Sequence, residues 1–205
     1  MTTRIVVVSA GLSNPSSTRL LADRLAAATT EALEEVELTQ VELRDLAHEL
    51  TDHLLTGFPK QALAEAIAAV RDADGLVVVT PVFSASYSGL FKTFFDVLES
   101  GTLEGKPVLI AATAGTARHS LVLDHALRPL FAYLRAIVVP TGVFAATDDF
   151  GDTGLQRRVE QAAGELAALA GKVQSSGSAR HHRTVDEEFA DPTPFEQLLK
   201  NASAP

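Results

Sequence analysis

Runs of apolar residues alternate with longer amphipathic segments along most of the chain. The runs that predict strands lie at residues 4–9, 36–43, 75–80, 107–113 and 136–142. The helices that the periodicity predicts lie at residues 17–33, 60–72, 88–99, 118–135 and 153–172. Strands that alternate with helices are typical of right-handed βαβ units, in which helices cover both faces of a parallel sheet. The pattern therefore predicts an α/β fold.

The predicted strands differ in how they expose their side chains. Residues 5–8 are all β-branched, which is typical of a strand buried on both faces. Residues 37–43 alternate between polar and apolar side chains, as expected of an edge strand. Because the first strand runs into a polar loop, we expect a flavodoxin-like sheet of five parallel strands in the order 2-1-3-4-5. In such sheets, ligands bind beyond the carboxyl ends of the strands.

The composition fits one domain with a substantial core. The chain has 205 residues, of which 46% are hydrophobic, and we place a single domain at residues 1–173. The sequence then takes on a linker-like composition, which predicts a polar tail over residues 174–205. Within this tail, Phe195, Leu198 and Leu199 either form a short docking arm for a partner subunit or belong to an unstructured terminus.

Charge and cysteine content exclude several classes of function. The formal net charge of −9 argues against nucleic acid or an anionic membrane as a partner. The absence of Cys excludes disulfides, thiolate metal ligands and a thiol nucleophile. No apolar stretch has the length of a membrane span, and the N-terminus does not resemble a signal peptide. We therefore expect a cytoplasmic protein.

The loop after the first strand combines the features of a phosphate site. Residues 9–18 carry five hydroxyl side chains, and a helix follows whose free N–H groups and dipole favour an anion. Only Arg19 adds a full positive charge nearby. The loop is neither a P-loop nor a Gly-x-Gly-x-x-Gly turn, and an ordinary capped helix is the alternative interpretation. The candidate binding residues are Ser9, Leu12, Ser13, Ser16, Ser17 and Thr18.

The loop after the third strand offers an apolar surface. Pro81 cannot continue the hydrogen-bond ladder, so the chain turns outward at this point. Val82 and Phe83 could then support a flat aromatic ligand, with Ser84 at its polar edge. Alternatively, Phe83 is an ordinary core residue. The phenylalanines of the next helix, at helical spacing, are expected to form a core face. They are Phe91, Phe94 and Phe95.

The fourth strand ends in small residues. Thr113, Ala114 and Gly115 leave room for a planar ring, and a glycine permits close approach of the backbone to a ligand. The loops after strands one, three and four should therefore meet in one crevice. The first suits a phosphate and the other two a flat heterocycle, and FMN has this shape.

Three stretches of the chain carry a family resemblance. They are residues 9–21, residues 81–96 with the pattern Ser-x-x-Gly-Leu-x-Lys-x-x-x-Asp, and residues 113–129. Through them the chain resembles the flavodoxin-like NAD(P)H-dependent FMN reductases over residues 3–172. It is most similar to the actinobacterial branch that partners luciferase-like monooxygenases.

This resemblance implies that residues 9–18 hold the FMN phosphate, that residues 81–84 flank the isoalloxazine and the ribityl chain, and that residues 113–115 face the pyrimidine edge. NADPH or NADH would donate the hydride, and a monooxygenase or another acceptor would take the reduced flavin. The chain departs from many relatives at Phe83, where they have Tyr followed by an amide. No side chain is expected to act as an acid or a base, because hydride transfer is chemistry of the cofactor.

Two further functions remain open on the same fold, a flavodoxin-like electron carrier and a quinone or azo-compound reductase. A carrier usually buries both flavin faces between aromatics, whereas this chain has no Trp and two Tyr. A serine hydrolase built on Ser9 or Ser13 would need an Asp-x-x-His near the C-terminus, and Asp186 has no such partner.

The helix predicted at residues 118–135 carries further candidates. Arg118 and His119 could contact phosphates of the nicotinamide nucleotide, or they could be solvated or lie at a subunit interface. His119 and His125 are six residues apart, so they do not form the pair that zinc requires, and no metal is expected. Residues 121–133 are apolar on more than one face, which predicts a homodimer or tetramer. Outside this helix, Asp148-Asp149 are interpreted as a loop and helix cap, and the tract at residues 181–183 lacks the spacing of a metal site.

Overall fold

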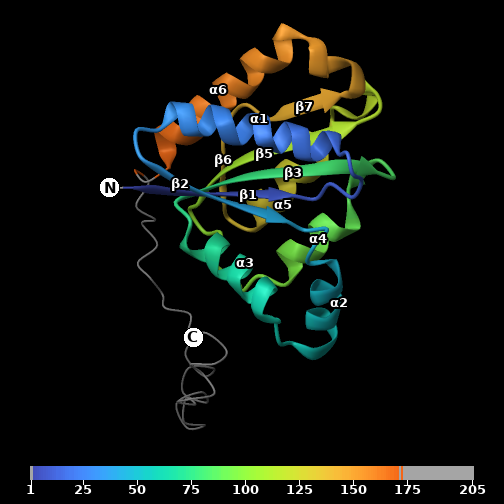
Figure 1. The fold of residues 1–205 in the computed structure, drawn as a ribbon, viewed down its shortest axis with the longest axis vertical. Coiled ribbons are helices and arrows are strands. Elements are labelled where there is room, and N and C mark those ends of the chain that lie inside the picture. Colours follow the sequence, from blue (N-terminus) through green and yellow to red (C-terminus); the bar gives the residue numbers. More distant parts are fainter. Residues whose placement is uncertain (1, 171, 173–205) are drawn as a thin grey trace, which may run out of the picture.

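A computed structural model describes residues 2–170 and residue 172. It contains one mixed sheet in which β2-β1-β3-β5-β6 lie side by side, while β4 pairs with β3 and β7 pairs with β5 (Figure 1). The strands are β1 (Thr3–Ser9), β2 (Val36–Glu42), β3 (Gly75–Phe83), β4 (Ser86–Tyr87), β5 (Pro107–Ala114), β6 (Ile137–Val138) and β7 (Val143–Ala146). The α-helices are α1 (Ser17–Ala32), α2 (Ala47–Thr56), α3 (Gln61–Asp72), α4 (Gly89–Asp96), α5 (Arg128–Tyr133) and α6 (Thr153–Leu169). The predicted tail, with its candidate docking residues, lies outside the described residues.

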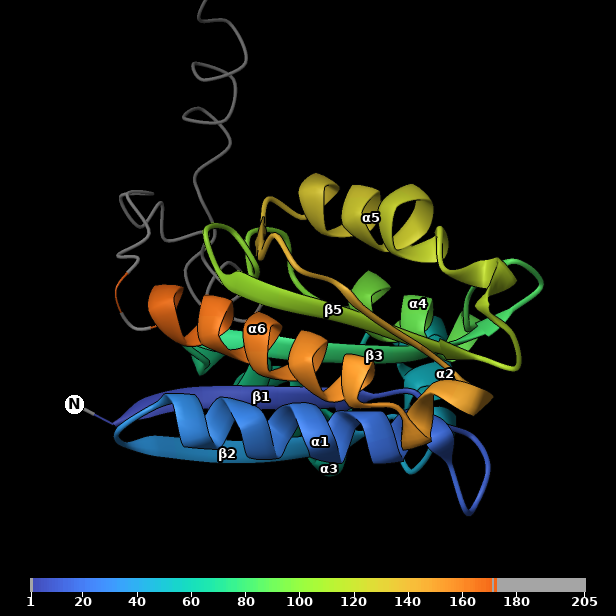
Figure 2. The ribbon, with the colours of Figure 1, turned by 90° about the horizontal axis from the view of Figure 1, so that it is seen from above.

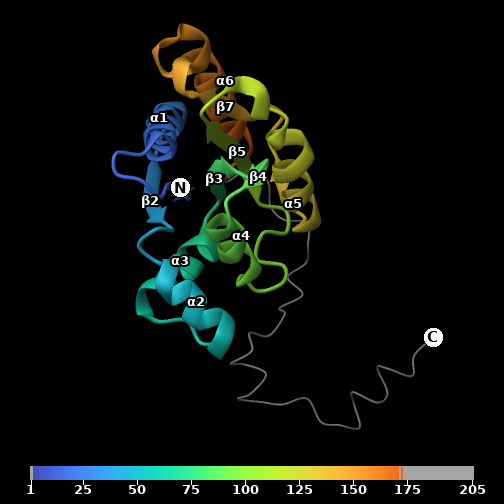
Figure 3. The same cartoon turned by 90° about the vertical axis from the view of Figure 1, so that its right-hand side faces the viewer.

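Helices cover both faces of the sheet (Figure 3). Helices α1 and α6 lie on one face, and α3, α4 and α5 lie on the other (Figures 2 and 3). Successive residues of β1 alternate between the two layers of core, because side chains of a strand point to opposite faces. Val6 and Val8 belong to the core under α3 and α4, whereas Ile5 and Val7 pack with α1 and α6. All strand pairs except β3–β4 are parallel, so the flavodoxin-like parallel sheet that the sequence predicts is present.

The expectation of five strands is wrong, because the sheet has seven strands within the described residues. The predicted fifth strand divides into β6 and β7, which pair with the two ends of β5. Pro140 lies in the gap and has no N–H to continue the ladder. Arg128 donates to the carbonyls of Val139 and Pro140 at 3.2 and 3.0 Å, which satisfies these unpaired groups.

A second addition is the short strand β4, which returns antiparallel to β3. Ser84 and Ala85 form the turn between them, and both have positive φ, 46° and 67°. Such turns usually contain Asn or Gly, and Ser84-Ala85 has neither, so the sequence does not predict this hairpin. Helix α2 was also not predicted, and Leu50 is its one fully buried position in the described chain.

The helix predicted at residues 118–135 is not continuous. It consists of the 3-10 turn η1 (Ala117–His119), the π-helix η2 (Leu123–Leu127) and then α5. The N–H of Arg128 reaches the carbonyl of Leu123, five residues back. Pro129 follows and has no N–H for an ordinary α-helical bond, which accounts for irregular winding at this point.

Candidate functional site

The carboxyl ends of β1, β3 and β5 lie beside one another at one edge of the sheet (Figure 2). Ser9, at the end of β1, is paired in register with Val79 of β3. Pro81 of β3 is in turn paired with Thr113 of β5. The three loops that the sequence singled out are therefore neighbours, as expected from parallel strands in this order.

A buried hydrogen bond joins the first and third of these loops. The hydroxyls of Thr18 and Thr113 lie 2.7 Å apart, and each residue is 3% exposed. The bond fixes the first turn of α1 against the end of β5. It also means that the Thr18 hydroxyl already has a partner within the protein.

Helix α1 begins at Ser17, and Ser16 is its N-cap. The Ser16 hydroxyl accepts a hydrogen bond from the Arg19 N–H at 3.2 Å. Gly11 lies so close to this cap that a Cβ added there would be 2.3 Å from the Ser16 Oγ. The loop therefore requires a glycine at this position for its close approach.

The predicted hydroxyls thus differ in availability. Ser13 and Ser17 are exposed, and neither side chain has a hydrogen-bond partner in the part of the chain that the structure describes. Ser9 is fully buried at the end of β1. Leu12 is 44% exposed on the same loop. Ser13 and Ser17 are the hydroxyls best placed to bind a ligand.

A polar hollow of about 370 Å³ adjoins this loop. Arg19 lies in its wall, but its guanidinium contacts acidic groups on both sides, Glu42 at 3.0 Å and Asp23 at 2.8 Å. The hydrogen bond to Asp23 is the main reason that the pKa of Arg19 is raised. The hollow is lined by Gly11, Ser13, Asn14, Ser16, Arg19, Glu42, Arg44 and Asp45.

Arg19 is not the sole cation near the loop, which corrects the sequence-based expectation. Arg44 also lines the hollow, and its side chain has no ion pair or hydrogen bond with another described residue. Its position follows from the sheet order, because β2 lies beside β1 and the Leu43 N–H bonds to the Ser9 carbonyl at 2.9 Å. The sequence pattern that could have located Arg44 is the alternation of β2, which predicts an edge strand. With β2 beside β1, the residues after β2 lie next to the loop after β1.

The second loop presents the predicted apolar surface. Phe83 is 47% exposed, so the alternative that it is a core residue is wrong. Val82 is half-buried beside it, as is Pro81, while Ser84 is exposed in the turn. The hairpin is fixed by the Ser88 N–H, which donates to the Thr80 hydroxyl at 3.0 Å. The three phenylalanines of α4 are buried, as predicted: Phe91, Phe94 and Phe95.

The third loop is open. A Cβ added at Gly115 would meet no described atom within 4 Å, and its φ is not in the left-handed region. The backbone conformation itself therefore does not demand glycine there, and the close approach of a ligand to Gly115 stays a prediction. Ala114 is half-buried, and Arg118 and His119 are exposed on η1 just beyond the loop. A contact of these two residues with a nucleotide stays a prediction.

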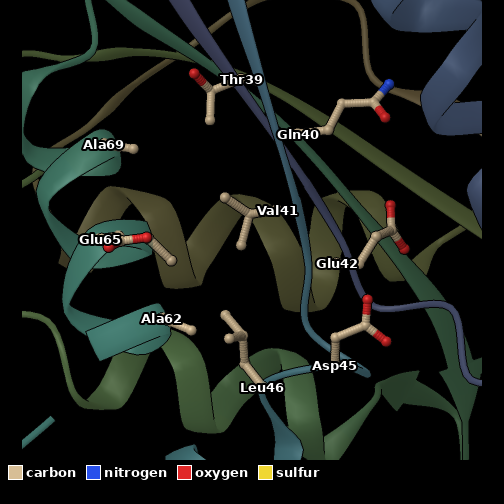
Figure 4. A pocket seen from close by; sticks show the side chains of 10 residues that line it. Thr39, Gln40, Val41, Glu42, Asp45, Leu46, Ala62, Glu65 and Ala69 are labelled. Carbon is tan, nitrogen blue, oxygen red and sulfur yellow. The ribbon is translucent and has the colours of Figure 1, made fainter. Parts of the chain in front are cut away.

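The remaining candidates lie elsewhere or have structural roles. Asp149 accepts a hydrogen bond from the Ala146 N–H at 2.8 Å and so caps a 3-10 turn, η3 (Thr147–Gly151). The cap of α6 is instead Asp152. A second hollow, of about 340 Å³, lies between β2 and α3 and shares Glu42 and Asp45 with the first (Figure 4).

The described residues contain neither a metal-binding cluster nor a membrane-spanning helix. Within residues 2–170, no cluster of three or more His, Asp or Glu side chains could hold a metal ion. No helix in that part of the chain has both the length and the apolar character needed to cross a membrane.

Comparisons with known proteins show to which family the chain belongs. Residues 3–151 match the family model of NADPH-dependent FMN reductase. The chain is 39% identical to an "FMN reductase (NADPH)" of Pseudomonas aeruginosa and 38% identical to the "NADH-dependent FMN reductase SfnE" of Pseudomonas putida. Each alignment covers 82% of this chain and 92% of the relative.

Among solved structures, an oxidoreductase of Corynebacterium diphtheriae superposes with a TM-score of 0.80 at 52% identity. That superposition covers 82% of this chain and 97% of the other. The match to the family model spans β1 through η3 and includes all three loops of the site. The chain belongs to the NADPH-dependent FMN reductase family.

Proposed function

We propose that this protein transfers hydride from NADPH or NADH to FMN, which binds across the loops after β1, β3 and β5. One observation carries the proposal. A polar hollow at the N-terminus of α1 lies at the same sheet edge as the exposed ring of Phe83. One ligand could therefore place its phosphate in the polar hollow and its flat ring against Phe83.

The residues present fit FMN. Ser13 and Ser17 have free hydroxyls, and the first turn of α1 provides N–H groups that favour an anion. Gly11 keeps the loop close to the helix, where a Cβ would collide with Ser16. Phe83 and Val82 offer apolar surface for a flat ring, and the open space at Gly115 leaves room beside it.

FMN, when bound, supplies the hydride-accepting ring, so the protein needs no acid or base of its own for this step. The residues named above bind and orient the flavin. Arg118 and His119 are proposed to contact phosphates of the nicotinamide nucleotide. Replacing Arg118 by Ala should then raise KM for the nucleotide more than it lowers kcat. A contact remote from the hydride stabilises the bound ground state and the transition state equally.

Two finer assignments belong to the same proposal. The reduced flavin would pass to a monooxygenase or another acceptor, as in the actinobacterial branch that the sequence resembles. The protein would also form a homodimer or tetramer in the cytoplasm. In support of an interface, Leu121 is 62% exposed and Tyr133 is 84% exposed on the segment formed by η2 and α5 with its flanks. Sedimentation showing a single 21.7 kDa species at micromolar concentration would contradict the oligomer.

Replacing Ser17 by Ala tests the phosphate assignment. Hydrogen bonds to charged groups contribute about 1.5–3 kcal/mol each, so FMN should bind roughly tenfold more weakly or worse. Riboflavin, which lacks the phosphate, should bind equally to both proteins. Ser100→Ala, at an exposed serine beyond α4, is the matched control and should leave both affinities unchanged. Equal affinity of the unmodified protein for FMN and riboflavin would contradict the assignment.

A further inference from the structure

An acidic side chain lies in the wall of the proposed phosphate hollow. Glu42 ends β2, where it is paired in register with Ser9 of β1. It lines the hollow together with Ser13 and Ser16. Figure 4 shows the carboxyl groups of Glu42 and Asp45 turned to the same side, away from α3. A phosphate held by the loop would therefore meet a carboxylate.

The charged groups around Glu42 come from three elements. From α1, Arg19 pairs with it at 3.0 Å, and Asp23 competes for the same guanidinium at 2.8 Å. From the segment after β2, Asp45 and Arg44 line the same hollow. From β1, the buried Ser9 hydroxyl favours the charged form of Glu42, although it makes no well-formed hydrogen bond within the described chain. Two carboxylates thus share Arg19, which leaves Arg44 as the unpaired cation.

We propose that Glu42 limits the affinity for the FMN phosphate and takes up a proton when that phosphate binds. This inference rests on the proposed function. A carboxylate and a phosphate in the same hollow repel each other, and the partial burial of Glu42 weakens the screening of this repulsion by water. Protonation removes the repulsion. It also releases Arg19 from one of its two acidic partners, so that its charge can act on the phosphate.

The direction of the pH dependence follows from the burial of Glu42. Burial raises the pKa of this carboxyl above its usual value, and Arg19 opposes the rise. A nearby phosphate dianion raises the same pKa further. Because the complex then holds the proton more tightly than the free protein, affinity for FMN increases as pH falls through the titration of Glu42.

The test compares FMN and riboflavin binding to the full chain in unmodified, Glu42→Gln and Glu37→Gln forms across pH 6 to 8.5. Glu37, also on β2, is exposed and is not among the residues that line the hollow, so its replacement removes the same charge elsewhere. The phosphate of FMN itself titrates near pH 6. The difference between the unmodified protein and Glu42→Gln cancels this contribution. Calorimetry in two buffers of different ionisation enthalpy measures the proton taken up.

We expect Glu42→Gln to bind FMN roughly tenfold more tightly at the upper end of this range, with riboflavin affinity unchanged. Proton uptake on binding FMN should be smaller in this variant than in the unmodified protein and in Glu37→Gln. If FMN outbinds riboflavin but Glu42→Gln gains no affinity, the role of Glu42 is overturned while the phosphate site stands. If the unmodified protein binds FMN and riboflavin equally, the phosphate site fails and this inference with it.

Discussion

The hydroxyls of Thr18 and Thr113 lie 2.7 Å apart in the buried interior, although the two residues are 95 positions apart in the sequence. Thr18 belongs to the first turn of α1, and Thr113 lies near the end of β5. This bond is the direct link between the loop proposed to hold a phosphate and the loop proposed to face the flavin ring. It should therefore matter for both stability and flavin binding.

Thr113→Val should lower the free energy of unfolding by about 1–3 kcal/mol, because it leaves the buried Thr18 hydroxyl without a partner. The double variant Thr18→Val/Thr113→Val should recover much of this loss, since both hydroxyls are then replaced by methyl groups of similar shape. Urea denaturation of the two single variants and the double variant measures the coupling. Strictly additive losses would show that the hydroxyls do not act as a pair.

Gly11 and Gly115 offer a matched comparison. A Cβ at Gly11 would lie 2.3 Å from the Ser16 Oγ, whereas a Cβ at Gly115 would meet no described atom within 4 Å. Gly11→Ala should therefore destabilise the protein and weaken FMN binding, because the helix cap must move. Gly115→Ala should leave thermal stability unchanged in the absence of flavin. A loss of FMN affinity in Gly115→Ala without a loss of stability would place the ring at this loop.

Ala85 has a φ of 67° in the β3–β4 turn, a conformation that costs a residue with a Cβ about 1–2 kcal/mol. Ala85→Gly should therefore raise the free energy of unfolding by about 1 kcal/mol. The same substitution at Ala27, exposed within α1, should lower it by about 0.5–1 kcal/mol. Denaturant unfolding of both variants measures the two free energies of unfolding. A loss of stability in Ala85→Gly would contradict backbone strain at Ala85.

Lys106 donates to the carbonyls of Val70, Arg71 and Ala73 at 2.7–2.8 Å and so caps the end of α3. Burial lowers the pKa of this ammonium from 10.5 to about 8. The folded protein therefore holds this proton less tightly than the unfolded chain, and stability contributed by Lys106 should rise as pH increases from about 8 to 10.5. Lys106→Met should lack this rise. Parallel stability-versus-pH curves for the two proteins in this range would contradict the lowered pKa.

The sequence predicted the parts of the fold that depend on local pattern. Two such patterns predicted burial, and both predictions are confirmed. They are the β-branched run of β1 and the helical spacing of Phe91, Phe94 and Phe95. The division of the fifth strand was not predicted. Pro140 interrupts the ladder there, and Arg128 satisfies the two carbonyls left unpaired, a tertiary contact that no periodicity encodes.

Prediction of the site from the sequence was limited in the same way, because tertiary contacts do not show in local patterns. The hydroxyl-rich loop and the exposed Phe83 were identified from residue types and their place after a strand. Arg44 and Glu42 were missed as site residues, because β2 enters the site only through its lateral neighbour β1. The commitment of the Thr18 hydroxyl to Thr113 likewise joins residues far apart in sequence. Residue types therefore located the loops, whereas tertiary packing determines which of their side chains can bind a ligand.

The central proposal is tested most directly by mixing the FMN-loaded protein with NADPH or NADH in the absence of oxygen and following flavin absorbance. Hydride transfer predicts rapid bleaching of the oxidised flavin with at least one of the two nucleotides. Ser17→Ala should reach the same rate only at higher FMN concentration. An absorbance that stays unchanged with both nucleotides would contradict a reductase and favour an electron carrier on the same fold.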